Sequence, residues 1–408
     1  METYLVGGSV RDKLLGIPVK DRDWVVVGST PEQMIDQGYQ AVGKDFPVFL
    51  HPKTHEEYAL ARTERKTGPG YRGFVVHAAP DVTLEQDLAR RDLTINAIAQ
   101  CSDGTLIDPF NGQNDLKNKI LRHVSPAFAE DPVRVLRLAR FAARFNFTVA
   151  DETKILILEM IHAGELDHLV PERVWQELEK ALKTNQPSLF FTTLKHVQAL
   201  AILFPEVDRL FGIPQVPKWH PEIDTGIHVM MVIDQAARLT DDIAVRFAAL
   251  CHDLGKGTTP SDILPQHIGH EHRSIGLTKA LCQRLRVPSD IQALAMKVAE
   301  FHTHIHLLNE LRPATILKVF EAIDAFRKPH RLKQFLLACE ADFRGRPGYE
   351  DLPMPAIRLF QDYFDAIQMV TAKPFIDSGL TGSAISEAIR KQRIEIIKQH
   401  ADIAKQNK

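Results

Sequence analysis

The sequence is poor in cysteine, lacks long apolar runs and carries almost no excess charge of either sign. Its four cysteines form no C-x-x-C pair and are too few to stabilise 408 residues by disulfides, which predicts reduced thiols and a cytoplasmic protein. No window approaches the roughly 18 uncharged apolar residues of a membrane-spanning helix, and the N-terminus lacks the pattern of a signal peptide. These absences predict a protein that is neither secreted nor membrane-spanning, with no membrane among its partners.

The charges nearly balance, because 50 Lys and Arg residues stand against 52 Asp and Glu residues for a net charge of −2. The composition therefore gives no global basic signal for nucleic acid, and a polyanionic partner must be bound by local patches. The 44% hydrophobic and 25% charged contents predict a folded chain. Its length predicts two or three domains.

Hydrophobic patterning changes along the chain. Up to about residue 125, β-rich runs alternate with helical stretches, as in an α/β or α+β domain, with strands expected at residues 4–6, 24–27, 58–61 and 74–77. From residue 128 the helical period dominates, with helices expected at residues 132–147, 152–162, 171–183 and 188–198. Prolines at positions 205, 214, 217 and 221 interrupt that period and predict a domain boundary. Half of the 18 histidines follow closely, at positions 220, 228, 252, 267, 270, 272, 302, 304 and 306.

The N-terminal region carries a pattern suited to nucleotidyl transfer. The segment GGSVRD at residues 7–12 leads from a strand into a helix, where glycine N–H groups and Arg11 can approach phosphate oxygens. Asp21 and Asp23 stand at the head of the next strand, and their spacing sends both carboxylates to one face, where they can share divalent cations with a triphosphate. Glu57, at the head of a later strand, is a candidate for a third carboxylate.

Three further patterns follow: RRDLTINA at residues 90–97, DPFNG at residues 108–112 and EDPVR at residues 130–134. The last opens a helix with one apolar face and, at about 100° per residue, an arc of about 120° that holds the guanidinium groups of Arg134, Arg137, Arg140 and Arg144. Asp131 and Arg134 lie one helical turn apart, so together they can present an acceptor and a donor to the Watson–Crick edge of a base. A solvated helix face is the alternative interpretation of the arginine arc.

In this order, GGSVRD, DRD, RRDLTINA, DPFNG and EDPVRVLRLARF resemble the motif series of class II tRNA nucleotidyltransferases, within the DNA polymerase β superfamily. The resemblance implies a CCA-adding enzyme, which builds or repairs the CCA end of tRNA from CTP and ATP without a nucleic-acid template, by two-metal phosphoryl transfer. It implies that Gly8 and Arg11 hold the triphosphate and that Asp21 and Asp23 hold Mg²⁺. It also implies nucleotide contacts from Arg91, Asp131, Arg134, Arg137 and Arg140.

A second constellation lies among the histidines. The segment CHDLGK at residues 251–256 closes an apolar helix expected at residues 245–250, so His252 and Asp253 lie side by side. With His228, His270, His302 and Asp342, they give the order H…HD…H…H…D, which resembles the HD phosphohydrolase superfamily. That resemblance implies one or two divalent metals that activate water against phosphate esters; mixed nitrogen and oxygen ligands leave Ni, Co, Mn and Mg open. Competing histidines for the later positions are His267, His272, His304 and His306.

A nucleotidyltransferase joined to an HD domain resembles the bacterial multifunctional CCA proteins over nearly the whole chain, and the fold implied is α+β. The expected domains are a polymerase-β-like head with a mixed sheet at residues 1–125, a helical neck and body at 126–204, a linker at 205–225, an HD domain at 226–346 and a helical region at 347–408. The resemblance also implies phosphatase, 2′-nucleotidase and 2′,3′-cyclic phosphodiesterase activities. On this hypothesis the HD site cleans damaged tRNA ends that lack the hydroxyl required by the head.

Three alternatives remain at this point: a poly(A) polymerase of the same class, an HD phosphohydrolase with a nucleotide-binding head, and a tRNA-binding factor without catalysis. The HD segment and the absence of a strongly basic C-terminal extension oppose the first, and the Asp21 and Asp23 pair opposes the second. Residues 62–73 mix charge with glycine and proline and are either a lid over the nucleotide or a hairpin loop. The sequence leaves open whether the protein is a monomer or a dimer.

Overall fold

The computed structural model describes residues 1–19, 21–42, 48–66 and 74–406. The chain divides into two compact units. The first contains Met1–Ala181 and Leu189–Leu203, and the second contains Leu182–Ser188 and Phe204–Lys408. The finer domain limits expected from the sequence stay predictions.

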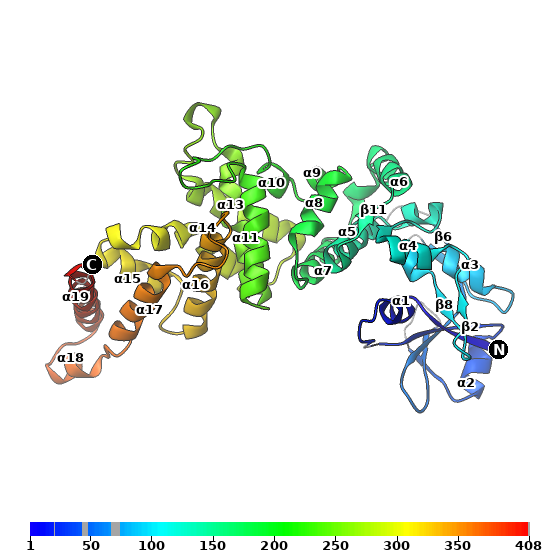
Figure 1. Ribbon diagram of the computed structural model, residues 1–408. Helices are drawn as coiled ribbons and strands as arrows, with labels where there is room; N and C mark the ends of the chain where they lie inside the picture. The colour runs from blue at the N-terminus through cyan, green and yellow to red at the C-terminus, as the bar shows by residue number, and fades with distance from the viewer. Residues whose placement is uncertain (20, 43–47, 67–73, 407–408) are drawn as a thin grey trace. The chain divides into compact units, whose positions relative to one another are not determined.

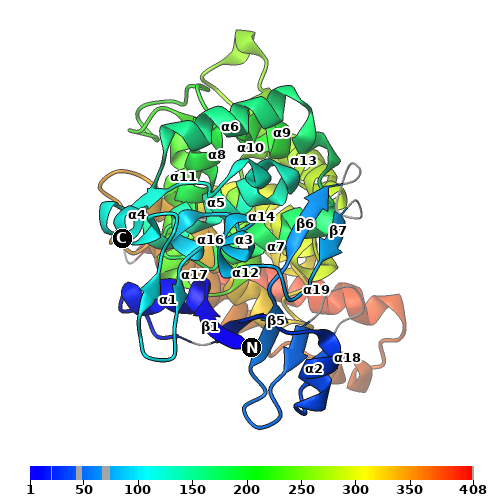
Figure 2. The same cartoon turned by 90° about the vertical axis from the view of Figure 1, so that its right-hand side faces the viewer.

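The first unit is built on a mixed seven-stranded sheet with the order β3-β4-β5-β2-β1-β8-β9. Its central strand β2 is antiparallel to β1 and parallel to β5. The strands of the unit are β1 (Glu2–Val6), β2 (Asp23–Val27), β3 (Gln40–Val42), β4 (Val48–Leu50), β5 (Glu57–Leu60), β6 (Thr63–Lys66), β7 (Phe74–His77), β8 (Ala99–Gln100), β9 (Leu106–Ile107), β10 (Ile120–Leu121) and β11 (Thr148–Val149). Outside the main sheet, β6 pairs with β7 in a separate antiparallel two-stranded sheet, visible in Figure 2. Most of the segment expected at residues 62–73 to be a lid or a hairpin loop lies outside the described residues.

Helices alternate with the strands of the first unit and predominate in its later part. Those of the first unit are α1 (Gly8–Leu14), α2 (Pro31–Asp36), α3 (Leu84–Ala89), η1 (Thr94–Asn96), α4 (Gly112–Asn118), η2 (Pro126–Glu130), α5 (Val133–Phe145), α6 (Asp151–His162), η3 (Glu165–His168), α7 (Pro171–Leu182), α8 (Ser188–His196) and α9 (Leu200–Leu203). The α+β fold class expected from the sequence is confirmed. One detail was wrong: β11 interrupts the region expected to be purely helical, because Asn146 ends α5 in a left-handed conformation and β-branched Thr148 and Val149 then pair with β10.

The main sheet is buried on both faces around β2. On one face Val25 packs with Val6 and Leu88, and on the other Val26 packs with Met34 and Phe49. Side chains alternate along a strand, so Asp23 shares its face with Val25. The apolar core therefore fixes the direction in which the first carboxylate of β2 projects.

The regular elements among the described residues of the second unit are all helices. Its elements are α10 (Pro205–Asp208), α11 (Thr225–Leu239), α12 (Ile243–Cys251), η4 (Leu254–Thr258), η5 (Ser261–Ile263), α13 (His270–Leu285), α14 (Ser289–His306), η6 (Leu308–Glu310), α15 (Pro313–Ala322), α16 (Pro329–Arg344), α17 (Pro355–Ile367), α18 (Lys373–Asp377) and α19 (Ser383–Gln406). In Figure 1, α11, α14 and α16 lie together, and α12 packs against all three. The C-terminal helix α19 contacts α15, α17 and α18. Among the described helices, none has the length and apolarity needed to span a membrane.

Candidate active sites

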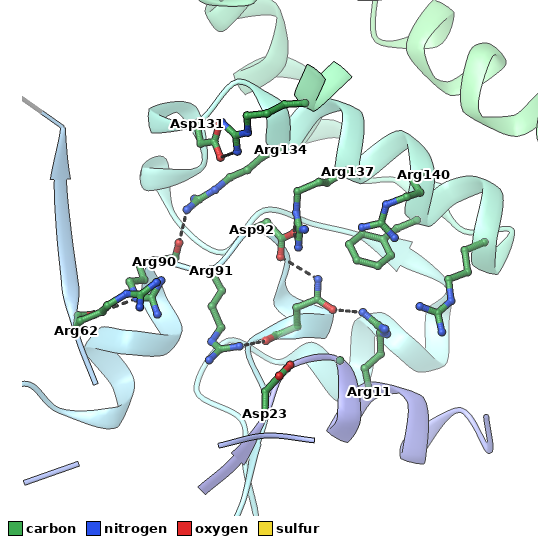
Figure 3. Close-up of a pocket in the computed structure, with 16 residues that line it drawn as sticks. Arg11, Asp23, Arg62, Arg90, Arg91, Asp92, Asp131, Arg134, Arg137 and Arg140 are labelled. Atoms are coloured by element: carbon green, nitrogen blue, oxygen red, sulfur yellow. Dashed lines mark hydrogen bonds and ion pairs between the residues drawn. The ribbon is translucent and has the colours of Figure 1, made fainter. Parts of the chain in front are cut away.

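A cavity of about 570 Å³ opens in the first unit between the start of α1, the RRDLTINA segment and helix α5. Figure 3 shows the guanidinium groups of several arginines directed into this space, with Asp23 at its edge. Its lining residues are Gly7, Gly8, Arg11, Asp23, Arg62, Arg90, Arg91, Asp92, Asn96, Asp131, Arg134, Arg137, Arg140, Phe141, Arg144 and Arg173. All seven nucleotide contacts implied by the sequence, from Gly8 to Arg140, therefore face one cavity.

The glycine turn between β1 and α1 lies at one wall of this cavity. Gly7 has φ +68°, and a Cβ atom at this position would stand 2.7 Å from Nη1 of Arg91. A side chain here would therefore be strained and would displace an arginine of the cavity. The turn keeps this wall open and lets Gly8 begin α1 beside Arg11.

The three candidate carboxylates lie near one another at the ends of two parallel strands. Asp23 and Glu57 are direct partners in the register of β2 and β5, so their side chains leave the same face of the sheet. Asp21 is exposed just before β2 and outside the cavity lining. Desolvation raises the pKa of Asp23, with a further increase from Asp21, while Arg91 opposes both. This repulsion between carboxylates is what a bound cation would relieve.

A continuous chain of hydrogen bonds runs along the floor of the cavity and joins α1 to α5. Arg144 donates to Asp12 at 2.8 Å, Arg11 donates to Asp12 at 2.7 and 2.8 Å, and Arg11 also donates to Oδ1 of Asn96. Asn96 in turn donates to Asp92 at 2.9 Å, which accepts from Arg137 at 2.8 Å. Burial alone would raise the pKa of Asp92, but the Arg137 charge and these hydrogen bonds hold it well below its usual range. The network therefore holds three of the arginines that line the cavity, Arg11, Arg137 and Arg144.

The four arginines of α5 line the cavity, as the helical spacing predicts, and Asp131 and Arg134 each bind further partners. Both carboxylate oxygens of Asp131 accept from Arg173 of α7, at 3.0 and 2.7 Å. Arg134 donates to the carbonyl oxygens of Ala127 and Arg90 at 2.8 and 2.7 Å. Arg140 pairs with Glu177, which also lies on α7. Sequence reasoning missed Arg173 and Glu177, because their partners lie more than 35 residues away and no local pattern marks the contact.

The DPFNG motif is structural in this fold. Asp108 accepts the backbone N–H groups of Gly112 and Gln113 at 2.7 and 2.9 Å, which caps the start of α4. Gly112 then lies so close to η1 that a Cβ atom would stand 2.2 Å from the Thr94 carbonyl oxygen. The motif thereby holds α4 against the segment that supplies Asn96 to the cavity network.

Replacing Gly112 with alanine should destabilise the protein, because backbone atoms of η1 cannot accommodate the added methyl group without moving. We expect a loss of about 1–3 kcal/mol in the free energy of unfolding, typical of overpacking. Thermal unfolding followed by circular dichroism measures it. Gly276→Ala is the matched control, since a Cβ there meets nothing within 4 Å and helix propensity favours alanine. Equal melting temperatures for Gly112→Ala and the wild type would contradict the packing described here.

The second unit buries a cluster of histidines and carboxylates where α11, α12, α13, α14 and α16 meet. All six residues expected from the sequence are buried there: His228, His252, Asp253, His270, His302 and Asp342. Nε2 of His270 and of His302 lie 3.2 and 3.4 Å from Oδ1 of Asp253, and Nε2 of His228 lies 3.1 Å from Oδ1 of Asp342. The donor atoms of three overlapping trios within this set lie within 4.8 Å of one another.

Backbone carbonyls orient the imidazoles of this cluster. Nδ1 of His252, His270 and His302 lies 2.6, 2.8 and 3.0 Å from the carbonyl oxygens one turn earlier, so these nitrogens carry the proton and donate. Each Nε2 is left with a lone pair that points into the centre. Nε2 of His252, Nε2 of His270 and Oδ1 of Asp253 have no hydrogen-bond partner among the described residues. Buried acceptors that face one another in this way fit a bound cation.

The competing histidines separate clearly in space. His272 is exposed on α13, and His267 bonds to Thr259 and the Pro214 carbonyl, outside the metal-like trios. His304 packs beside Phe301. His306 lies at the edge of the cluster, where its Nε2 is 2.7 Å from Oδ2 of Asp342.

Three further residues lie beside the cluster and were not predicted as site residues from the sequence: Lys256, Glu222 and His220. Lys256 places Nζ 2.7 Å from Oδ2 of Asp253. Glu222 places Oε1 2.9 Å from Nδ1 of both His220 and His228. The charge of Lys256 opposes the effect of burial, and the pKa of Asp253 is held well below its usual value. The available sequence signals were Lys256 in HDLGK and the segment WHPE at residues 219–222. Neither pattern indicates which side chains of the cluster these residues contact.

Comparison with known families finds three matches along the chain. The family described as poly A polymerase head domain matches residues 3–122, the probable RNA and SrmB-binding site of polymerase A matches residues 146–211, and the HD domain matches residues 225–326. The multifunctional CCA protein of Thioalkalivibrio sulfidiphilus is 62% identical over 402 residues, which cover 98% of each chain. That of Nitrosococcus oceani is 63% identical over 399 residues, again 98% of each chain. This chain belongs to the multifunctional CCA protein family.

Solved structures share the fold of this family member. The Thermotoga maritima CCA-adding enzyme complexed with tRNA has 20% identity and a TM-score of 0.64, with 99% of this chain and 91% of that chain covered. The Bacillus stearothermophilus CCA-adding enzyme in complex with CTP has 23% identity and a TM-score of 0.63, with coverage of 99% and 93%. The head and HD families to which the two units correspond are both metal-dependent, which agrees with the facing acceptors around Asp253.

Proposed function

We propose that this member of the multifunctional CCA family adds and repairs the CCA end of tRNA from CTP and ATP in the cavity of the first unit. The observation that carries the proposal is the shared cavity itself, in which a glycine turn, Asp23 and the α5 arginines face one another. A triphosphate needs many cationic donors, and a template-free enzyme needs fixed polar groups to select the base. Both kinds of group line this one cavity.

Within this cavity, Gly8, Arg11 and Arg91 are proposed to bind the triphosphate. Arg137 and Arg140 lie further along α5 and are proposed to contact the nucleotide, whereas Asp131 and Arg134 are proposed to contact its nucleobase. Since Asp131 is already held by Arg173, its carboxylate is oriented before a nucleotide enters. Preorganised donors and acceptors cost little rearrangement on binding, and selectivity between C and A then depends on which edge they can pair with.

Asp21 and Asp23 are proposed to hold Mg²⁺, with Glu57 beside Asp23 as a third carboxylate. When bound, such ions polarise the tRNA 3′-hydroxyl and neutralise charge on the pyrophosphate that leaves. The protein's own contribution is to orient the α-phosphorus for in-line attack, because Arg11 holds the triphosphate. The tRNA hydroxyl attacks directly, so no covalent intermediate with the enzyme forms.

The buried cluster of the second unit is proposed to be a phosphohydrolase centre that removes phosphate from RNA 3′ ends, including 2′,3′-cyclic ends. His228, His252, Asp253, His270, His302 and Asp342 would hold one or two divalent ions, with Ni, Co, Mn and Mg all compatible with these ligands. When bound, the metal lowers the pKa of water and so supplies the nucleophile. Its product would be a terminal hydroxyl that the head can extend.

The partners proposed are tRNA, CTP and ATP. A cytoplasmic location is proposed because the substrates are tRNA and free nucleotides and because the four cysteines are free.

Incubating the protein with Mg²⁺, labelled CTP and ATP, and a tRNA that ends at the discriminator base tests the proposal for the first unit. We expect addition to stop at CCA when product ends are sequenced. A long A tail would make the protein a poly(A) polymerase, and no addition would leave the first unit a binding module. Incubating a tRNA with a 2′,3′-cyclic end and each divalent metal tests the second unit, because one water opens the ring to a phosphate monoester and a second water releases phosphate. Absence of both ring opening and phosphate release with every metal would contradict that assignment.

A further inference from the structure

The segment between α10 and α11 forms a closed loop beside the HD cluster. Pro214 and Asp224 form an isolated antiparallel bridge, and the Gln215 N–H donates to the Ile223 carbonyl at 2.7 Å. Asp224 also caps α11 by accepting the Ile227 N–H at 3.0 Å. These bonds hold residues 214–224, here called the WHPE loop, in one shape despite their three prolines.

Two sets of contacts attach the WHPE loop to the cluster. On one side, Nζ of Lys256 donates to Oε1 of Gln215 at 2.6 Å and contacts Asp253 at 2.7 Å. On the other side, Glu222 lies 2.9 Å from Nδ1 of His228, and the His220 ring centroid is 4.7 Å from that of His228. The loop is thus held in place by residues in direct contact with the proposed metal ligands.

Between these two attachments the loop presents a cation and a large aromatic ring to solvent. Trp219 is 58% exposed although it directly precedes the inward-facing His220, whose Cα is about 3.8 Å away along the chain. Nζ of Lys218 lies 4.7 Å from the Trp219 ring centroid. Val216 accepts the N–H groups of both Trp219 and His220, so a single turn fixes the outward ring relative to the inward one.

An exposed tryptophan beside a lysine suits one kind of occupant in particular. Nucleobases stack on aromatic rings whatever their sequence, and an ammonium group nearby favours the phosphate or ribose side of the same nucleotide. The proposed metal ligand His228 is in ring contact with His220, the residue next to Trp219, and the bound metal would hold the phosphate being hydrolysed. We propose that Lys218 and Trp219 form the platform on which the HD centre stacks the terminal nucleobase of its nucleotide or RNA substrate. This inference rests on the phosphohydrolase function proposed above.

Hydrolysis of two phosphate monoesters, with and without a base, tests the platform. The probes are 2′-AMP and glycerol 2-phosphate, with the divalent metal that best supports the wild type. For Trp219→Ala we expect KM for 2′-AMP to rise about 5- to 150-fold, the equivalent of the 1–3 kcal/mol of one stacked base, with kcat little changed. Hydrolysis of glycerol 2-phosphate should keep its wild-type kcat/KM. Trp219→Phe should restore most of the affinity, and Met369→Ala, at another exposed apolar residue of the second unit, should change neither substrate.

A binding measurement keeps the platform and the proposed hydrolysis distinguishable. The chain has three tryptophans, so the difference in emission between wild type and Trp219→Phe reports Trp219 alone. We expect 2′-AMP to quench this difference signal in the metal-loaded protein. Quenching without hydrolysis would support the platform and refute the phosphohydrolase, whereas hydrolysis of 2′-AMP without quenching would refute the platform.

Two other outcomes would also overturn the inference. An equal loss of activity on both monoesters in Trp219→Ala would mean that the ring only supports the loop. A change in sedimentation coefficient with unchanged hydrolysis would assign the exposed ring to a contact between proteins.

Discussion

Replacing Asp23 with asparagine should abolish most CCA addition while leaving the HD centre intact. Asn keeps the shape of the side chain but removes the charge that a divalent ion needs, and the lost stabilisation of several kcal/mol corresponds to about a thousandfold in rate. Asp23 is the one of the three candidate metal-binding carboxylates that lines the cavity, and desolvation already raises its pKa, an effect that a bound cation would oppose. Single-turnover addition of CMP to a tRNA lacking CCA measures the effect.

Two comparisons make this result specific. Asp36→Asn, at an exposed acidic residue of α2, should retain wild-type addition. Hydrolysis of 2′-AMP by Asp23→Asn should remain within about twofold of wild type, since the HD cluster lies in the other compact unit. A variant with unchanged CMP addition would remove Asp23 from the catalytic groups, and a parallel loss of both activities would point to misfolding.

Much of the first unit followed from the sequence because its signals are local. The strands expected at residues 4–6, 24–27, 58–61 and 74–77 are confirmed within one or two residues at each end. The spacing of the α5 arginines also predicted their common direction, since a helical period relates residues within one element. Contacts between elements behave differently: Arg173 binds Asp131 across 42 residues, and a period along one helix carries no information about its neighbour.

The histidines of the second unit show the same limit within a shorter stretch. Helical geometry alone separates His304 from His302, because two residues correspond to about 200°. It cannot separate His306 from His302, which are one turn apart on the same face. The structure separates them by burial and by partner: His302 is more deeply buried and lies beside Asp253, whereas the less buried His306 contacts Oδ2 of Asp342. The contact between the WHPE loop and the cluster could not be predicted from the sequence either, since Glu222 and Lys256 belong to different elements.

His270→Ala should lower both the metal content of the protein and its HD hydrolysis, whereas His272→Ala should lower neither. The two histidines lie two residues apart on α13 and are chemically identical, but His270 is buried with Nε2 3.2 Å from Asp253, and His272 is exposed. A cation held by His270 and Asp253 together would lose one of its ligands in this variant. We therefore expect at least a tenfold loss of metal affinity, the size of loss, about 10- to 100-fold, seen when residues that support a metal site are removed. Metal analysis after dialysis against graded chelator concentrations measures this independently of activity.

The same pair of variants separates metal loss from unfolding. A bound ion stabilises only the folded state, so added metal should raise the melting temperature of the wild type and of His272→Ala, and this rise should be much smaller for His270→Ala. CCA addition should be unaffected in both variants, because the cavity around Asp23 lies in the first unit. Equal metal content in the two variants would show that the buried imidazole is held by hydrogen bonding alone, and the proposed ligand set would then have to exclude His270.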